Sequence, residues 1–122
     1  MKLKTLKGKV FDLNVTASRH PMKTEKSCKS NIQYLAGQKL RKKYPSDVIL
    51  EEVHIPDGFY LDFFIPSRKI AVEVQGEQHS EFVPHFHKNK AGFVRSQDRD
   101  ARKAEWCRIN DIDLIYVDKD TI

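Results

Sequence analysis

The sequence has only two cysteines and no long hydrophobic run, and each of these features argues against a class of protein. The apolar stretch 112–117 is interrupted by Asp113, whereas a membrane-spanning helix needs about 20 predominantly apolar residues. The basic N-terminus has no continuous apolar segment and does not resemble a secretory signal. Cys28 and Cys107 lie far apart, which favours two free thiols over a disulfide framework. We therefore expect an intracellular, cytoplasmic protein with no membrane partner.

The composition that remains is typical of one globular domain. Of the 122 residues, 39% are hydrophobic and 32% are charged, which is enough for a single modest core. Lys and Arg outnumber Asp and Glu by 22 to 17, which gives a formal net charge of +5. A charge of this sign suits a polyanionic partner, but it supports such a partner only together with other observations.

Two segments divide the chain. Residues 1–29 are rich in Lys and Arg, and we interpret them as a basic N-terminal arm with a short strand within 9–15. Such an arm either packs loosely or lies on the phosphates of a nucleic acid. Residues 30–122 carry the regular hydrophobic patterns, and we expect them to form the core domain.

The core domain begins with a helix and continues with strands. Apolar residues between 32 and 40 repeat at helical spacing, with Ser27 or Ser30 as the N-cap and Pro45 ending the helix. Runs rich in β-branched and aromatic residues then predict three successive strands. These strands span 48–55, 59–65 and 69–75, and the turn Pro56-Asp57-Gly58 joins the first two.

A loop rich in His and Phe is expected over 77–92, followed by a charged helix over 93–110 and a buried strand over 112–118. The inner stripe of this helix is expected to consist mainly of small side chains. Its members would be Val94, Ala101, Ala104 and either Cys107 or Arg108. The order helix-strand-strand-strand-helix-strand predicts an α/β fold, an α+β sandwich with one mixed central sheet.

The chemically informative pattern is Asp62, then ten residues, then Glu73-Val74-Gln75. Side chains alternate along a strand, so Glu73 and Gln75 share a face, and a short connection can bring Asp62 beside them. Two converging carboxylates suit Mg²⁺, and the backbone carbonyl of Val74 can add a third oxygen. Ordinary surface acids are the simpler interpretation. Against it, the neighbours of Glu73 in IAVEV are apolar, and a buried acid needs a partner or a metal.

This succession across two strands resembles the PD-(D/E)XK nuclease superfamily. The segments YLDFFIPSRKIAVEVQGEQH and RSQDRDARKAEWCRINDIDLIYV are similar to the branch that contains very-short-patch-repair nicking enzymes and phage EDxHD-type homing endonucleases. The resemblance spans about residues 28–118. It implies a restriction-endonuclease-like core and a Mg²⁺-dependent endodeoxyribonuclease of homing or nicking type, in which Mn²⁺ can replace Mg²⁺. It also implies a phage-encoded protein that acts inside a bacterial host.

The resemblance assigns roles to five residues. Asp62 and Glu73 correspond to the two acidic metal ligands, and Gln75 occupies the position usually held by lysine. Gln33 falls where relatives often have a helix-borne glutamate, and its neutral side chain could orient water. His79 matches a histidine that serves as a general acid or base or as a phosphate contact; the simpler interpretation is a partly exposed loop histidine.

Basic residues of the loop and the second helix are expected to contact DNA phosphates. They are Lys88, Lys90, Arg95, Arg99 and Lys103. Arg99, Asp100 and Lys103 match an R-D-x-x-K pattern of the family, in which Asp100 would pair with His79 or Arg99. The simpler interpretation is a solvated helix face with i,i+3 pairs.

Two other classes of function stay open. Gln75 in place of lysine is compatible with a DNA-binding module on a nuclease fold that has little or no activity. His79, His85 and His87, with Cys107, suggest a zinc site, but their spacing matches no common zinc pattern. So short a chain has little surface with which to read a long DNA site. Specificity is therefore either low or supplied by a homodimer or a partner.

Overall fold

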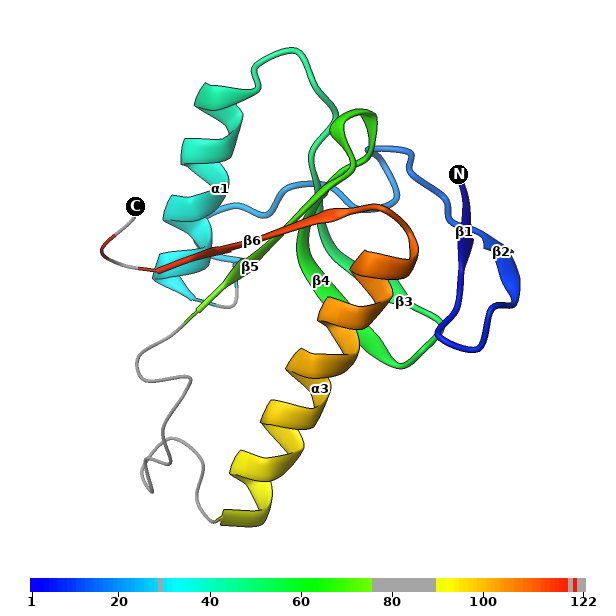
Figure 1. Ribbon diagram of the computed structural model, residues 1–122. Coiled ribbons are helices and arrows are strands. Elements are labelled where there is room, and N and C mark those ends of the chain that lie inside the picture. Colours follow the sequence, from blue (N-terminus) through cyan, green and yellow to red (C-terminus); the bar gives the residue numbers. More distant parts are fainter. Residues whose placement is uncertain (29, 76–89, 119, 121–122) are drawn as a thin grey trace.

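The computed structural model describes residues 1–28, 30–75, 90–118 and 120, with the backbone alone for residues 90–96. A four-stranded sheet lies at its centre, with two helices and a small N-terminal hairpin around it (Figure 1). The strands of the sheet are β3 (Leu50–Ile55), β4 (Phe59–Ile65), β5 (Ile70–Val74) and β6 (Asp113–Val117). The helices are α1 (Asn31–Lys43) and α3 (Lys90–Ile109), and the hairpin pairs β1 (Lys2–Lys4) with β2 (Val10–Asp12).

The central sheet is mixed and has the strand order β3-β4-β5-β6. β3, β4 and β5 form an antiparallel meander, and β6 lies parallel to β5. The first turn of the meander has Gly58 at a φ of 96°, a conformation that glycine adopts without strain. A one-turn 3₁₀ helix, Pro66–Arg68, makes the second connection. α3 belongs to the long crossover that a parallel pair requires.

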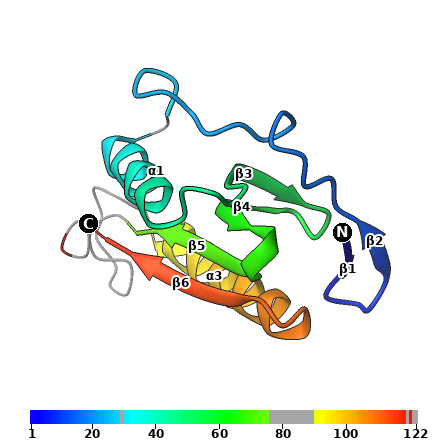
Figure 2. The same ribbon diagram turned by 90° about the horizontal axis from the view of Figure 1, so that it is seen from above.

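The two helices cover opposite faces of the sheet, as the view from above shows (Figure 2). Ala36 of α1 packs with Phe63 and Val72, whereas Trp106 of α3 belongs to the cluster that contains Phe64. Alternate residues of one strand therefore enter two different cores, because successive side chains point to opposite faces. The described residues form a mixed α/β fold with two helices and a mixed sheet, in agreement with the sequence prediction.

Glu52 interrupts the alternation in β3. Its φ of 52° lies in the left-handed region, where a residue with a side chain is strained. Leu50 and Val53 are three residues apart, yet both enter the core cluster that contains Trp106. Glu51 between them faces α1. The irregular backbone at Glu52 thus lets β3 supply both cores.

Local signals positioned α1 correctly. Ser30 is extended and its side-chain oxygen accepts a hydrogen bond from the backbone N–H of Gln33 at 3.1 Å, which identifies it as the N-cap. The last turn carries Arg41, Lys42 and Lys43, whose charges suit the negative end of the helix dipole. The helix ends just before Pro45, as predicted.

The basic N-terminal segment contributes to the core that contains Trp106. Leu3 and Leu13 are buried there, and Phe11 packs against it. The hairpin is also tied to the end of α3, because Asn110 Oδ1 accepts from the backbone N–H of Lys4 at 2.7 Å and Asn110 Nδ2 donates to the Lys4 carbonyl at 3.0 Å. Residues 1–13 thus pack against the core domain while their lysines face outward.

The predicted inner stripe of α3 is right at Cys107 and wrong at its alanines. Ala101, Ala104 and Arg108 are exposed, and the buried face is made by Trp106 and Cys107, with the side chain of Lys103 largely buried. Small alanines give no strong periodic signal, so the sheet beneath the helix, rather than the helix sequence, decides which face is covered. The helix also begins at Lys90, three residues before the predicted start at 93. Of the predicted loop, residues 77–89 lie outside the described residues.

Among the described residues, no helix is long and apolar enough to cross a membrane. The two cysteines, Cys28 and Cys107, are free thiols.

Candidate active site

Asp62 and Glu73 meet where β4 and β5 separate. The register pairs Ile65 with Ile70 and Phe63 with Val72, so the next position places Asp62 opposite Glu73. At this point side-chain carboxylates, rather than backbone carbonyls, accept hydrogen bonds from backbone N–H groups. The backbone N–H of Asp62 donates to Glu73 Oε2 at 2.8 Å, and the backbone N–H of Val74 donates to Asp62 Oδ2 at 2.8 Å. The structure therefore brings together the two acids that the sequence singled out.

A lysine from α3 completes this group. Lys103 Nζ donates to Glu73 Oε1 as an ion pair, and the two side chains are only 11% and 9% exposed. The sequence interpretation assigned Lys103 to a DNA phosphate, whereas in the structure its ammonium lies on the carboxylate of Glu73. We refer to Asp62, Glu73 and Lys103 as the acid–lysine cluster.

Burial and neighbouring charges shift the pKa values of residues in and beside the cluster. Burial raises the pKa of Glu73, and the negative charge of Asp62 raises it further, while Lys103 acts in the opposite direction. Burial, followed by the charge of Glu73, also raises the pKa of the neighbouring Cys107 thiol to about 12. Glu73 thus lies between a second carboxylate and an ammonium in a largely buried place.

Tyr116 and Asp100 border the acid–lysine cluster. Tyr116 lies beside Glu73 in the parallel pairing of β5 and β6. Burial raises the pKa of Tyr116, and the charges of Asp100 and Glu73 add to this effect. Sequence reasoning named Asp100 but missed Tyr116, because no local pattern says which residue of β6 will lie beside Glu73.

The other predicted site residues are not shown in contact with the acid–lysine cluster, and several lie outside the described residues. Gln75 follows β5 and is half-buried, and its backbone N–H donates to the carbonyl oxygen of Val117 at 2.8 Å. Arg99 is exposed on α3. His79 and Lys88 lie outside the described residues, as do His85 and His87. Lys90 and Arg95 belong to α3, but their side chains are not described.

Gln33 takes part in a different buried group. It is 1% exposed, and its Nε2 donates to Glu51 Oε2 at 2.8 Å, not to Asp62 or Glu73. Glu51, which is 4% exposed, also accepts from the backbone N–H of Lys23 at 2.8 Å and from Cys28 Sγ at 3.3 Å. This group, which we call the Glu51 cluster, ties the segment before α1 to the helix and the sheet.

Sequence reasoning did not single out Glu51. The signal was present, because an acid within the apolar run VILEEVHI is the same feature that identified Glu73.

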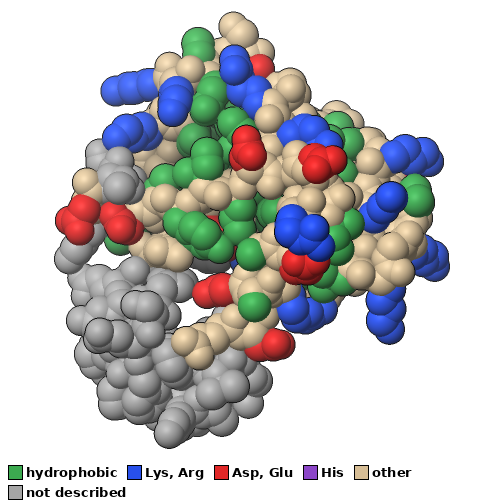
Figure 3. Space-filling view, viewed as in Figure 1, with side chains coloured by type: hydrophobic (Ala, Val, Ile, Leu, Met, Phe, Trp, Pro, Cys, Tyr) green, Lys and Arg blue, Asp and Glu red, His purple; other side chains and the backbone are tan. Residues whose placement is uncertain are grey.

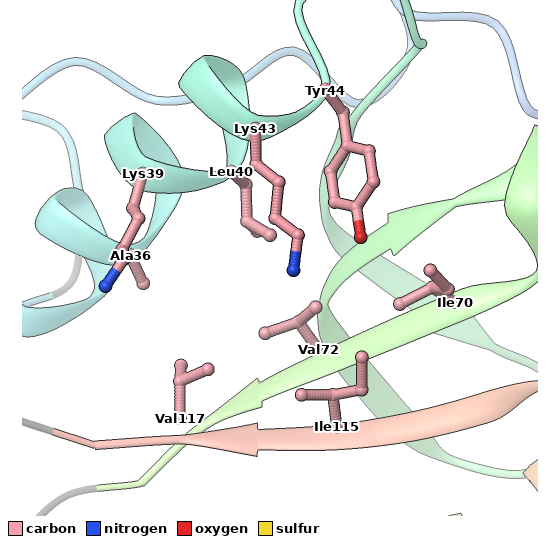
Figure 4. A pocket seen from close by; sticks show the side chains of 9 residues that line it. All are labelled: Ala36, Lys39, Leu40, Lys43, Tyr44, Ile70, Val72, Ile115 and Val117. Carbon is pink, nitrogen blue, oxygen red and sulfur yellow. The ribbon is translucent and has the colours of Figure 1, made fainter. Parts of the chain in front are cut away.

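A groove lies on the α1 face, between α1 and the strands β5 and β6 (Figure 4). It has a volume of about 240 Å³, and its lining is mainly apolar, with Lys39 and Lys43 contributed by α1. Figure 3 shows hydrophobic side chains in this central region and Lys and Arg along the upper and right-hand rim of the same view. The residues of the acid–lysine cluster do not line the groove.

The donor set of the cluster fits a hard cation in its chemistry. Within the described residues, no group of three or more His, Cys, Asp or Glu side chains is placed to hold a metal ion. Asp62 and Glu73 nevertheless form a pair of adjacent carboxylates, and Lys103 pairs with Glu73. Carboxylate and carbonyl oxygens are the ligands that Mg²⁺ prefers, so a divalent ion would be held by these two acids with the Val74 carbonyl.

Comparisons with known proteins find relatives of unstated function. No family model matches the chain, and no solved structure matches it. It is 46% identical over 57 residues to uncharacterized protein 307L of Invertebrate iridescent virus 6, covering 47% of this chain and 29% of the relative. It is 31% identical over 96 residues to uncharacterized protein 094L of Frog virus 3, covering 78% of this chain and 61% of the relative. The chain thus spans less than two thirds of these viral relatives.

Proposed function

We propose that this protein is a Mg²⁺-dependent endonuclease that hydrolyses phosphodiester bonds in DNA. The observation that carries the proposal is the buried pair of Asp62 and Glu73 on neighbouring strands, with Lys103 on Glu73. An acid pair with one lysine in a largely buried place is costly to stability. Its presence is therefore better explained by chemistry than by packing.

The arrangement of elements supports the same proposal. A helix, a meander of three strands, a second helix and a parallel strand follow in the order expected of a restriction-endonuclease-like core. The acids lie where β4 and β5 separate, as the resemblance to the PD-(D/E)XK superfamily implies for its metal ligands. We therefore assign Asp62, Glu73 and the Val74 carbonyl as the residues that would hold Mg²⁺ or Mn²⁺.

Each residue of the site then has a defined task. A bound divalent ion would supply a polarised water and would stabilise charge on the scissile phosphate. Asp62 and Glu73 hold their oxygens in place through the backbone N–H groups of Val74 and Asp62. Lys103 brings the ammonium that Gln75 does not provide, from α3 instead of β5. Arg99, exposed on the same helix, would contact the DNA backbone.

A specific observation favours the alternative of a binding module without turnover. Both oxygens of Glu73 already accept hydrogen bonds from protein donors, one from Lys103 and one from the N–H of Asp62. The pair is thus partly satisfied by the protein alone. In this alternative the basic surface binds DNA, and no bond is broken.

Plasmid cleavage separates the two functions. Supercoiled DNA is incubated with wild type, Asp62→Asn or Glu73→Gln in Mg²⁺, in Mn²⁺ or in EDTA. The matched control is Glu105→Gln, which removes an exposed α3 carboxylate that pairs with Arg108. Each site variant is expected to cleave at least about a hundredfold more slowly, a typical loss for one transition-state contact, with DNA binding retained. Full cleavage by either would contradict the proposal, and binding without cleavage by wild type would favour the binding module.

A further inference from the structure

Both carboxylate oxygens of Glu73 accept hydrogen bonds, one of them from Lys103. Glu73 Oε2 accepts from the backbone N–H of Asp62, and Oε1 accepts from the Lys103 ammonium. We infer that Lys103 is an internal counter-ion that a divalent cation displaces from Glu73, so that this lysine sets the metal affinity of the site. The inference rests on the proposed function, since it takes Asp62 and Glu73 to be the metal ligands.

The two contacts on Glu73 differ in how readily they yield. The N–H of Asp62 belongs to the backbone of β4, which is fixed by its pairing with β3 and β5. The ammonium of Lys103 sits on a flexible chain of four methylenes and can leave without moving the sheet. A cation that approaches Glu73 therefore competes with Lys103 rather than with the backbone.

The charges at the cluster also favour displacement of Lys103 by a divalent ion. Asp62 and Glu73 are adjacent acids, and the ammonium of Lys103 pairs with Glu73. A divalent ion neutralises the two acids by itself and repels an ammonium held beside it. The favoured arrangement with metal is thus the acid pair with the divalent ion, and Lys103 released.

The released lysine has a consequence for substrate binding. Lys103 lies on α3, the same helix as the exposed Arg99, so a freed ammonium is available to a phosphate at the edge of the cluster. Metal binding would then favour phosphate binding, and by thermodynamic reciprocity phosphate would favour metal. Lys103 would couple the two ligands.

Calorimetric titration with Mg²⁺ and Mn²⁺, in the absence of DNA, tests the inference without measuring activity. Lys103→Met and Lys103→Gln are expected to bind either metal about tenfold more tightly than wild type, which corresponds to about 1.4 kcal/mol. Arg108→Gln removes the same charge from an exposed position of α3 and is expected to bind like wild type. Glu73→Gln is expected to lose binding. Lys103→Gln keeps a neutral donor near Glu73, so it serves if the methionine variant does not fold.

The outcomes separate this inference from the proposed function. If wild type and the Lys103 variants bind metal equally well, Lys103 is not a competing counter-ion, and the metal site itself stands. If neither wild type nor a folded Lys103 variant binds metal, the metal site is wrong and the inference falls with it. Tighter binding by the Lys103 variants, with Arg108→Gln unchanged, supports the counter-ion.

Discussion

Two buried glutamates on opposite faces of one sheet are stabilised in different ways. Glu51 faces α1 and is held by neutral donors, namely the backbone N–H of Lys23, the Cys28 thiol and the Gln33 amide. Glu73 faces α3, lies beside a second acid and is held by the ammonium of Lys103. Both are almost fully buried, at 4% and 7% exposed. Burial is therefore not what distinguishes them; their partners are.

The difference indicates which glutamate is structural. The donors of the Glu51 cluster come from the segment before α1 and from α1 itself, so this carboxylate joins pieces of the fold. In the acid–lysine cluster two like charges are kept together, which opposes folding and has no packing benefit. Like-charged pairs of this kind are common in active sites. Three measurements, given in order of decreasing effect, test this difference between the two glutamates.

The largest effect is expected from Lys103→Met. It leaves Glu73 beside Asp62 without a cation, and losing one partner of a buried ion pair costs about 3 kcal/mol of the free energy of unfolding. Adding Glu73→Gln to the same protein removes the unpaired charge and should recover most of the loss. Urea unfolding of wild type, both single variants and the double variant at neutral pH measures this coupling. A Lys103→Met protein as stable as wild type would show that the pair is not coupled.

A smaller loss is expected from Glu51→Gln. The amide places an NH₂ group against one of the donors that now face a carboxylate oxygen, which costs about 1.5 kcal/mol, the value of a hydrogen bond to a charged group. Cleavage by this variant should equal that of wild type, in contrast to Glu73→Gln. Urea unfolding measures the expected loss of stability, and the plasmid assay measures the expected unchanged cleavage. If Glu51→Gln abolished cleavage in a folded protein, the division into a structural and a functional glutamate would be wrong.

The smallest effect is a dependence of stability on pH. Burial and Asp62 raise the pKa of Glu73, so the folded protein keeps a proton there at a pH at which the unfolded chain has lost it. Wild type should therefore lose stability relative to Glu73→Gln as pH rises from the ordinary glutamate pKa to the raised one. Unfolding of both proteins across this range measures the trend.

Glu105 provides the control of opposite sign. A hydrogen bond from Arg108 lowers the pKa of Glu105, so the stability it contributes is present above the ordinary glutamate pKa and is lost as pH falls through the lowered value. Glu105→Gln should accordingly change relative to wild type in the opposite direction, and below the ordinary glutamate pKa rather than above it. The same slope for both variants would mean that the trend does not arise from Glu73.

Local chemistry made part of this structure predictable. Three predicted features each depend on a few adjacent residues, and the structure confirms them. They are the boundaries 59–65 of β4, the Ser30 cap of α1 and the turn Pro56-Asp57-Gly58. The meeting of Asp62 with Glu73 was also predictable, because strand alternation and a short connection leave few other arrangements. Where the local signal was weak, as along α3, the predicted inner stripe was right at Cys107 but wrong at Ala101 and Ala104.

The sequence alone therefore determined the two acids and the order of elements from residue 30 onward, since both follow from periodicity and spacing, whereas the N-terminal strand β1 was not predicted. The tertiary structure decided what those acids touch. Lys103 lies 30 residues beyond Glu73 in the chain, and only the crossing of α3 over the sheet brings its ammonium to that carboxylate. The Gln33 amide was likewise drawn to Glu51, 18 residues away. Such contacts depend on how elements pack, and packing is fixed by the whole core rather than by any short pattern of residues.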